Sequence, residues 1–174
     1  MENENTYTTK KNLEIQKLIL ASINNTFNTN ALFLNTNLEL IDINQNACKL
    51  FEIIKSKRNF ILRYSNQNCQ ICVDKTFKVF NSIASNNLGK DFLIIASIKS
   101  IKDFYQNKKS NISQNLKPYF IKNEKGLFLN EPNRVSILIV DSKGRIENSI
   151  FPEKSLKWYN DFLFNSFKNK YYLN

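Results

Sequence analysis

The feature that most constrains this chain is a pair of cysteines, Cys69 and Cys72, set between a strand pattern and a helix pattern. Residues 59–64 form an apolar strand-like run that leads directly to the first cysteine. Over residues 69–84 the apolar side chains recur on one face of a helix: Val73, Phe77, Phe80 and Ala84. Residues 91–98 form a continuous apolar run, typical of a strand buried on both faces. We therefore expect a right-handed strand–helix–strand unit with the cysteines at the start of its helix.

The region before this unit predicts short elements. Residues 31–34 and 38–43 are typical of two short strands, which would pair as a hairpin. Residues 47–54 predict one or two helical turns, and three apolar side chains would face inward: Leu50, Phe51 and Ile54.

The region after the unit predicts further strands and a terminal helix. Residues 135–140 and 145–150 predict two strands joined by a turn at 141–144, which makes a hairpin. Pro152 then opens a terminal helix with an apolar stripe formed by Leu156, Tyr159, Leu163 and Phe167. Less distinct patterns predict a short helix at 100–108 and short edge strands at 118–121 and 126–129.

Length and composition predict one domain. The chain has 174 residues, of which 42% are hydrophobic, and this is enough material for one core. Residues 1–10 are polar and predict a disordered tail. A single domain would cover residues 11–174, with residues 11–34 as an N-terminal helical extension. No repeat and no linker composition indicates a second domain.

No segment reaches the ~18–20 apolar residues of a membrane span, and the polar start carries no signal peptide. Taken literally, the sequence predicts a cytoplasmic protein. If a leader or anchor has been trimmed, the periplasm or cell envelope is expected instead, and the sequence leaves both locations open.

Composition excludes several classes of function. The chain contains no histidine, which removes Ser-His-Asp and Cys-His catalysis within one chain. It has only three glycines and neither a GxGxxG nor a GxxxxGK phosphate loop. Three cysteines without histidine are too few for an ordinary zinc site. Composition therefore argues against a metal site and against a phosphate-binding loop.

The net charge of +10 raises the question of an anionic partner, either nucleic acid or a membrane surface. The basic residues are scattered along the chain rather than gathered in one stripe, and no nucleic-acid motif accompanies them. The composition is also crowded with asparagine, isoleucine and lysine, which explains the charge as a compositional bias. We therefore do not expect a nucleic-acid partner.

The spacing of Cys69 and Cys72 suits redox chemistry. A thiol at a helix start lies beside unpaired N–H groups and the positive end of the helix dipole, which favour the thiolate. The second thiol lies one turn on, within reach of a disulfide. Two other interpretations remain: half of a zinc site, or a pair of buried structural cysteines. Cys48, the third cysteine, is typical of a small buried apolar residue.

On these residues the chain resembles the thioredoxin-like superfamily. The resemblance is carried by the strand ending Arg63-Tyr64-Ser65, by the segment from Cys69 to Asp74, and by the order of the elements that follow. Within the superfamily, the chain is similar to cell-envelope thiol–disulfide oxidoreductases and peroxiredoxin-like proteins of Bacteroidetes-type bacteria. The similarity covers about residues 35–170. It implies a three-layer α/β/α sandwich with a central mixed sheet and an N-terminal extension.

The chain departs from that family at its substrate groove. The family usually has a cis-proline opposite the cysteines, where this chain has Val135 or Ser136. Asn68 replaces the usual aromatic residue before the first cysteine, and Asn66 occupies the place of the peroxidatic threonine. Arg63 falls near the buried carboxylate of thioredoxin proper, where it could lower the pKa of Cys69. The candidate groove residues are therefore Asn68, Gln70, Ile71, Arg134, Val135 and Ser136.

The resemblance implies thiol–disulfide exchange on protein substrates, with Cys69 as nucleophile and Cys72 as resolving thiol. The partner would be a protein thiol or disulfide, and no cofactor is implied. The alternative is a thioredoxin-fold binding or scaffold module with weak or no redox turnover. The sequence leaves open the direction of exchange, the substrate and the oligomeric state.

Overall fold

A seven-stranded mixed sheet forms the centre of the computed structural model, which describes residues 2–29, 32–87, 91–98, 100–102, 104, 112–122, 134–152 and 157–172. The strand order is β2-β1-β5-β4-β3-β6-β7. The strands are β1 Glu39–Ile41, β2 Ala47–Lys49, β3 Asn59–Ser65, β4 Asp91–Ser97, β5 Leu116–Ile121, β6 Ser136–Val140 and β7 Ile146–Ile150. The helices are α1 Glu2–Thr29, α2 Leu50–Ile53, α3 Gln70–Ser85 and α5 Lys157–Tyr172.

The unit β3–α3–β4 is the centre of the sheet and confirms the predicted strand–helix–strand pattern. β3 pairs in parallel with β4, from Asn59 opposite Asp91 to Ser65 opposite Ser97. On its other side β3 pairs antiparallel with β6, and β6 continues into the predicted hairpin with β7. β3 is buried from residue 59 to 64 because strands cover both of its edges and side chains pack on both of its faces.

Alternation along the strands divides the interior into two apolar clusters, one on each face of the sheet. The cluster that contains residues of α3 and α5 includes Phe60, Leu62, Tyr64, Phe77, Phe80, Phe92, Phe164 and Phe167. The cluster on the other face includes Leu34, Leu38, Leu50, Ile54, Ile61, Leu93, Ile95 and Leu138.

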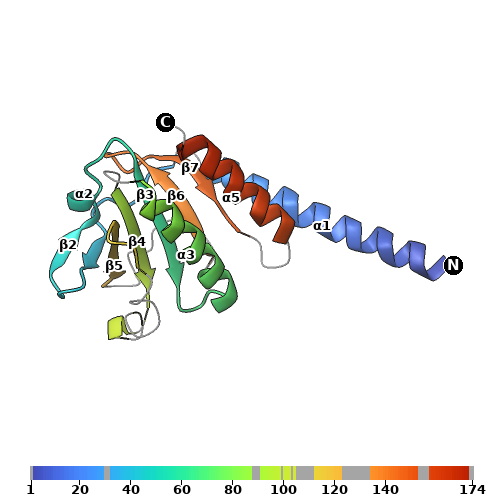
Figure 1. Ribbon diagram of the computed structural model, residues 1–174, viewed down its shortest axis with the longest axis horizontal. Helices are drawn as coiled ribbons and strands as arrows, with labels where there is room; N and C mark the ends of the chain where they lie inside the picture. The colour runs from blue at the N-terminus through green and yellow to red at the C-terminus, as the bar shows by residue number, and fades with distance from the viewer. Residues whose placement is uncertain are drawn as a thin grey trace.

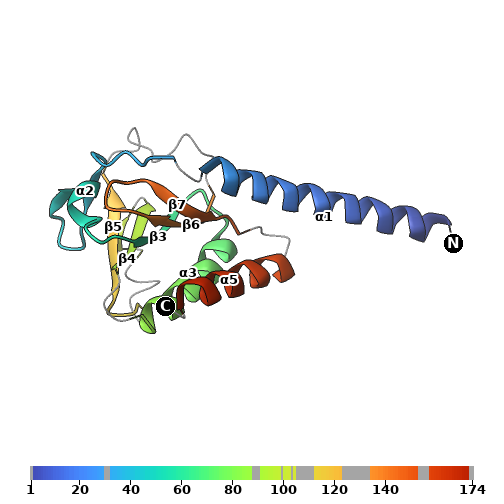
Figure 2. The ribbon, with the colours of Figure 1, turned by 90° about the horizontal axis from the view of Figure 1, so that it is seen from above.

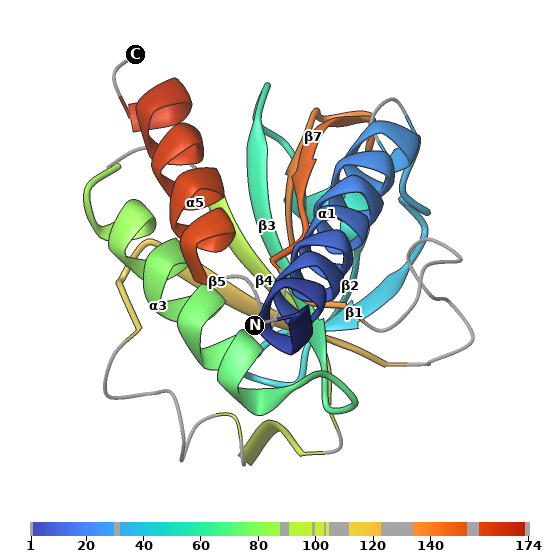
Figure 3. The ribbon, with the colours of Figure 1, turned by 90° about the vertical axis from the view of Figure 1, so that its right-hand side faces the viewer.

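The helices form two layers about the sheet (Figure 1). Figures 2 and 3 show α3 and α5 together on one face, and α2 and the C-terminal end of α1 on the side of the other face. These layers confirm the predicted α/β/α sandwich. The rest of α1 extends away from the sheet, and its N-terminal end is remote from it (Figure 1). In the described part of the chain, no helix is both long and apolar enough to cross a membrane.

The prediction for residues 31–54 is wrong in part. The described residues 32–34 do not pair with residues 38–43: β1 pairs antiparallel with β2, and Phe33 makes a single bridge to Arg145. The turn after β1 explains this, because the Asp42 carboxylate accepts the N–H groups of Asn44 and Asn46, each at 2.8 Å. This turn sends the chain back as a strand at residues 47–49, where helix was expected.

The helical turn predicted nearby is present but shorter, as α2. Its start is held by the Glu52 carboxylate, which accepts the Lys49 N–H at 2.6 Å. Leu50 and Ile54 are fully buried as predicted, whereas Phe51 is 48% exposed and does not face inward.

The N-terminal helix is longer than the prediction. The sequence predicts a helical extension over residues 11–34, preceded by a disordered tail at residues 1–10. In the structure, α1 is one helix over Glu2–Thr29. Extending an existing helix adds one hydrogen bond for each residue fixed, so polar residues can continue a helix that they would not begin.

The C-terminal half agrees with the prediction in part where it is described, and the strand predicted at 118–121 is present as β5. β5 is not an edge strand, since it lies between β4 and β1. β1 pairs only with Phe120 and Ile121 of β5, so Pro118, which has no N–H, lies outside that ladder.

In α5, Tyr159 and Phe167 of the predicted stripe are buried. Residues 101, 102 and 104 are helical. The rest of the 100–108 helix, the 126–129 strand and Leu156 lie outside the described residues.

The turn between β6 and β7 requires a glycine at residue 144. Gly144 has φ +83, in the left-handed region. Its carbonyl accepts the Leu34 N–H at 2.8 Å, which holds residues 32–36 against the hairpin. A Cβ on Gly144 would lie 2.5 Å from Cγ2 of Thr36.

We expect Gly144→Ala to lower the free energy of unfolding by about 1–3 kcal/mol, through both backbone strain and this contact. Urea denaturation of the wild type, Gly144→Ala and Thr36→Ser/Gly144→Ala measures the two parts. The double variant lacks Cγ2 of Thr36, so it should regain the stability lost to the close contact but not the stability lost to backbone strain. A Gly144→Ala protein as stable as the wild type would contradict the expectation.

Candidate active site

A hydrogen-bonded turn places Cys69 beyond the end of β3. The Ser65 N–H donates to Oδ1 of Asn68 at 2.7 Å, and the Asn68 N–H donates to the Ser65 carbonyl at 3.1 Å. The Asn66 N–H donates to the carbonyl of Ser97, the last residue of β4, at 2.9 Å. Asparagine suits such a turn because its short side chain bonds to nearby backbone groups. These contacts fix the turn against the carboxyl ends of both parallel strands.

Cys69 is the N-cap residue of α3 and is half-buried. Its backbone is non-helical, with φ −56 and ψ 117, and its carbonyl accepts the Val73 N–H at 3.0 Å. At this position the thiol adjoins the N–H groups of the first turn, which have no partner within the helix, and the positive end of the helix dipole. Both effects stabilise a thiolate over a thiol.

Cys72 lies in the first turn of α3 and packs against the apolar cluster beneath that helix. It is also half-buried. Its carbonyl accepts the hydroxyl of the buried Thr76 at 2.7 Å, in addition to its place in the helix. Cys48, Cys69 and Cys72 are not joined by disulfides. Among the described residues, no cluster of metal-ligating side chains is found.

The start of β6 lies at the same end of the sheet as the cysteines. Ser136 pairs in register with Arg63, two residues before the end of β3. Val135 is buried and belongs to the cluster under α3, which also contains Tyr64 and is contacted by Cys72. Arg134, just before it, is half-buried. The fold therefore brings the predicted groove residues 134–136 to the cysteine end of the sheet.

Arg63 is buried, with 4% of its surface exposed. Strand alternation places it on the face of Ile61, whereas α3 covers the face of Leu62. Its partners in register are Ile95 and Ser136. The Arg63 side chain therefore leaves the strand on the face opposite α3. Its predicted effect on the pKa of Cys69 stays a prediction.

The other predicted groove residues differ in how much of each side chain a substrate could contact. The Asn68 side chain is engaged by the Ser65 N–H, and the Gln70 amide donates to the Asp74 carboxylate at 2.9 Å. Ile71, between the cysteines, is 60% exposed. Ile71 is therefore the apolar side chain next to the cysteines that is most available for contact.

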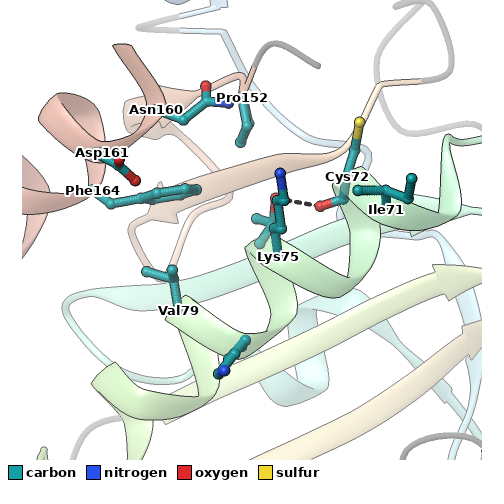
Figure 4. Close-up of a pocket in the computed structure, with 10 residues that line it drawn as sticks. Ile71, Cys72, Lys75, Val79, Pro152, Asn160, Asp161 and Phe164 are labelled. Atoms are coloured by element: carbon teal, nitrogen blue, oxygen red, sulfur yellow. Dashed lines mark hydrogen bonds between the residues drawn. The ribbon is translucent and has the colours of Figure 1, made fainter. Parts of the chain in front are cut away.

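A cavity of about 270 Å³ begins at Cys72 and runs between α3 and α5. Figure 4 shows Ile71, Cys72, Lys75 and Val79 on the α3 side, and Pro152, Asn160, Asp161 and Phe164 across from them. Sequence reasoning missed this site because its two walls lie about 90 positions apart in the chain. One signal was present in the sequence. Ile71, Lys75 and Val79 recur every fourth residue, so two apolar residues share the lysine-bearing face of the helix.

We expect Cys69 to react with iodoacetamide faster than either other cysteine. Its helix-cap position favours the thiolate, whereas burial, chiefly, and nearby Glu52 and Asp42 raise the pKa of Cys48. A raised pKa leaves less thiolate at neutral pH and slows alkylation. Brief labelling of the reduced protein, followed by peptide mass spectrometry, measures the three rates. Equal rates at Cys69 and Cys48 would count against an activated cysteine.

Comparison with known proteins supports the fold. The sequence matches no protein-family profile, and no curated protein shows significant sequence similarity to it. Among solved structures, it is similar to the thioredoxin domain of a thiol-disulfide oxidoreductase from Bacteroides vulgatus. The TM-score is 0.53 at 14% identity, covering 79% of this chain and 93% of that one. A secreted disulfide oxidoreductase from Mycobacterium tuberculosis aligns with a TM-score of 0.52 at 12% identity, covering 75% and 93%.

Proposed function

We propose that this chain, which has the thioredoxin-like fold, exchanges thiols and disulfides with a protein partner through Cys69 and Cys72. The observation that carries the proposal is the position of Cys69 as the half-buried N-cap of α3, with Cys72 in the first turn of the same helix. The names of the two similar structures describe redox proteins, and this agrees with a redox role for a chain of this fold.

The exchange proceeds in two steps. The Cys69 thiolate attacks one sulfur of the partner's disulfide, which breaks the S–S bond, forms a mixed disulfide and releases one partner thiolate that takes up a proton. The Cys72 thiolate then attacks the Cys69 sulfur, forms the Cys69–Cys72 disulfide and releases the second partner thiol. Two electrons pass from the two cysteines to the partner, and the reverse sequence oxidises a partner dithiol.

The proposal is tested by trapping the intermediate. Cys72→Ser cannot resolve the mixed disulfide, so incubation with excess insulin should give a covalent adduct between Cys69 and an insulin chain. Mass spectrometry under non-reducing conditions measures the adduct, which dithiothreitol should remove. Cys69→Ser/Cys72→Ser is the matched control and should form none. If the single and double variants trap insulin equally, Cys69 is not the nucleophile.

The alternative is a binding or scaffold module of the same fold. It is favoured by Val135 and Ser136, both buried, one of which stands where the resemblance leads one to expect the groove proline. A module would bind its partner without a covalent intermediate. Absence of any adduct with Cys72→Ser, in protein whose thiols are shown to be free, would favour the module over the enzyme.

A further inference from the structure

The cavity between α3 and α5 has a floor and a rim of different chemistry. Phe164 is 7% exposed, and Val79 and Pro152 are half-buried, so the deeper surface is apolar. Lys75 and Lys78 on α3 and Asp161 on α5 are exposed at its margin. An apolar floor with a charged rim is the form of a recognition pocket.

The volume of the cavity limits what it can hold. At about 270 Å³ it lies below the roughly 300–1,000 Å³ of sites for organic cofactors and drug-sized ligands. It has room for one large side chain. Single aromatic side chains seated in such pockets commonly supply much of the energy of a protein–protein interface. The size therefore favours a side chain of a partner protein.

The rim is positive. Two lysines oppose one aspartate there, and the chain as a whole carries +10. Within the described residues, neither Lys75 nor Lys78 forms an ion pair. Unpaired lysines beside an apolar pocket complement carboxylates that flank an apolar side chain.

The pocket is continuous with the cysteine pair. Cys72 itself lines it, and the exposed Ile71 lies at the same end (Figure 4). A polypeptide segment that presents a cysteine to Cys69 would thus pass Ile71 and reach the pocket a few residues further along.

We propose that this pocket receives an aromatic side chain of the partner protein, and that acidic residues flanking it pair with Lys75 and Lys78. The inference rests on the proposed function, because the protein that fills the pocket is taken to be the partner that exchanges thiols with Cys69. It defines the partner as a segment with an aromatic residue between carboxylates, close to a cysteine.

A cysteine-free peptide tests the pocket separately from the exchange. Amide NMR spectra of the reduced full-length protein are followed during titration with acetyl-Gly-Glu-Phe-Glu-Gly-amide. We expect shifts on both walls, at Ile71, Val79 and Phe164. The same peptide with alanine in place of phenylalanine should bind about tenfold more weakly or worse, because it loses the burial of the ring.

The charge of the rim is tested with surface variants. Lys75→Glu/Lys78→Glu should weaken binding of the peptide about five- to tenfold, since two exposed attractions become repulsions. Lys11→Glu/Lys17→Glu on α1 is the matched control, because it makes the same change in net charge at exposed positions away from the pocket. It should bind as the wild type does.

Several results would overturn the inference. These are shifts confined to other surfaces, equal affinity for the phenylalanine and alanine peptides, or equal weakening in the two double variants. Phenylacetate binding as tightly as the peptide would assign the pocket to a small molecule instead. If the peptide binds but Cys69→Ser keeps full insulin reductase activity, the proposed function fails and the pocket stands. If activity needs Cys69 but no peptide binds, only the pocket assignment fails.

Discussion

Replacing Cys69 with serine is expected to lower the rate of insulin reduction by dithiothreitol to that of the uncatalysed reaction. A serine hydroxyl at the N-cap of α3 still suits the helix start, so the fold should be retained. It cannot form the mixed disulfide, which is the first covalent step. Turbidity from the precipitating insulin chains measures the rate. No other described side chain occupies an equivalent position, so no partial activity is expected.

Cys48→Ser is the matched control. Cys48 lies on β2, partly buried against the cluster on the far face of the sheet from α3. Its loss should leave the rate of insulin reduction unchanged. A Cys69→Ser protein as active as the wild type would refute the enzyme proposal. A Cys48→Ser protein with no activity would show that the third cysteine takes part in the exchange.

The second large effect is expected from Phe80→Ala, which should lower the free energy of unfolding by about 3–5 kcal/mol. Phe80 lies on the inward face of α3 and is fully buried. Its ring packs edge-on against Phe92 with centroids 5.5 Å apart, and Phe92 in turn stacks on Phe60 at 4.8 Å. The loss is a large share of the ~5–15 kcal/mol that stabilises a typical domain. Equilibrium denaturation in urea, followed by circular dichroism, measures it.

Phe162→Ala serves as the control for the same change of residue type. Phe162 lies on α5 and is 61% exposed, so its truncation should change the free energy of unfolding by less than about 0.5 kcal/mol. Similar losses in the two variants would mean that the aromatic stack is not the main source of stability on the α3 side.

The sequence predicts the central unit well because its signals are strong and local. The buried strand at 59–65, the helix at 70–85 and the strand at 91–97 each have one dominant period of apolar residues. The hairpin at 136–150 is equally clear, since its apolar runs flank a turn that contains Gly144. In these segments burial and local propensity favour the same structure.

Prediction is weaker between residues 31 and 54, because the apolar runs there are short and tertiary contacts determine the secondary structure. The Asp42 turn makes residues 47–49 a strand, although their composition also suits a helix. The partner of β1 on its other side is β5, some 80 positions later, and no local pattern predicts that pairing. The cysteine pair was found from its motif, whereas the pocket depends on two helices that meet only in the folded chain.

Cys72 both lines the pocket and is the thiol proposed to close the disulfide, and this links binding to redox equilibrium. Forming the disulfide draws the Cys72 sulfur towards Cys69 and changes one end of the pocket. By thermodynamic reciprocity, a partner that binds one redox form more tightly stabilises that form. Tighter binding to the dithiol raises the reduction potential, and tighter binding to the disulfide lowers it. A tenfold preference for the dithiol raises the potential by about 30 mV. The seated partner would then adjust the driving force of the reaction in which it takes part.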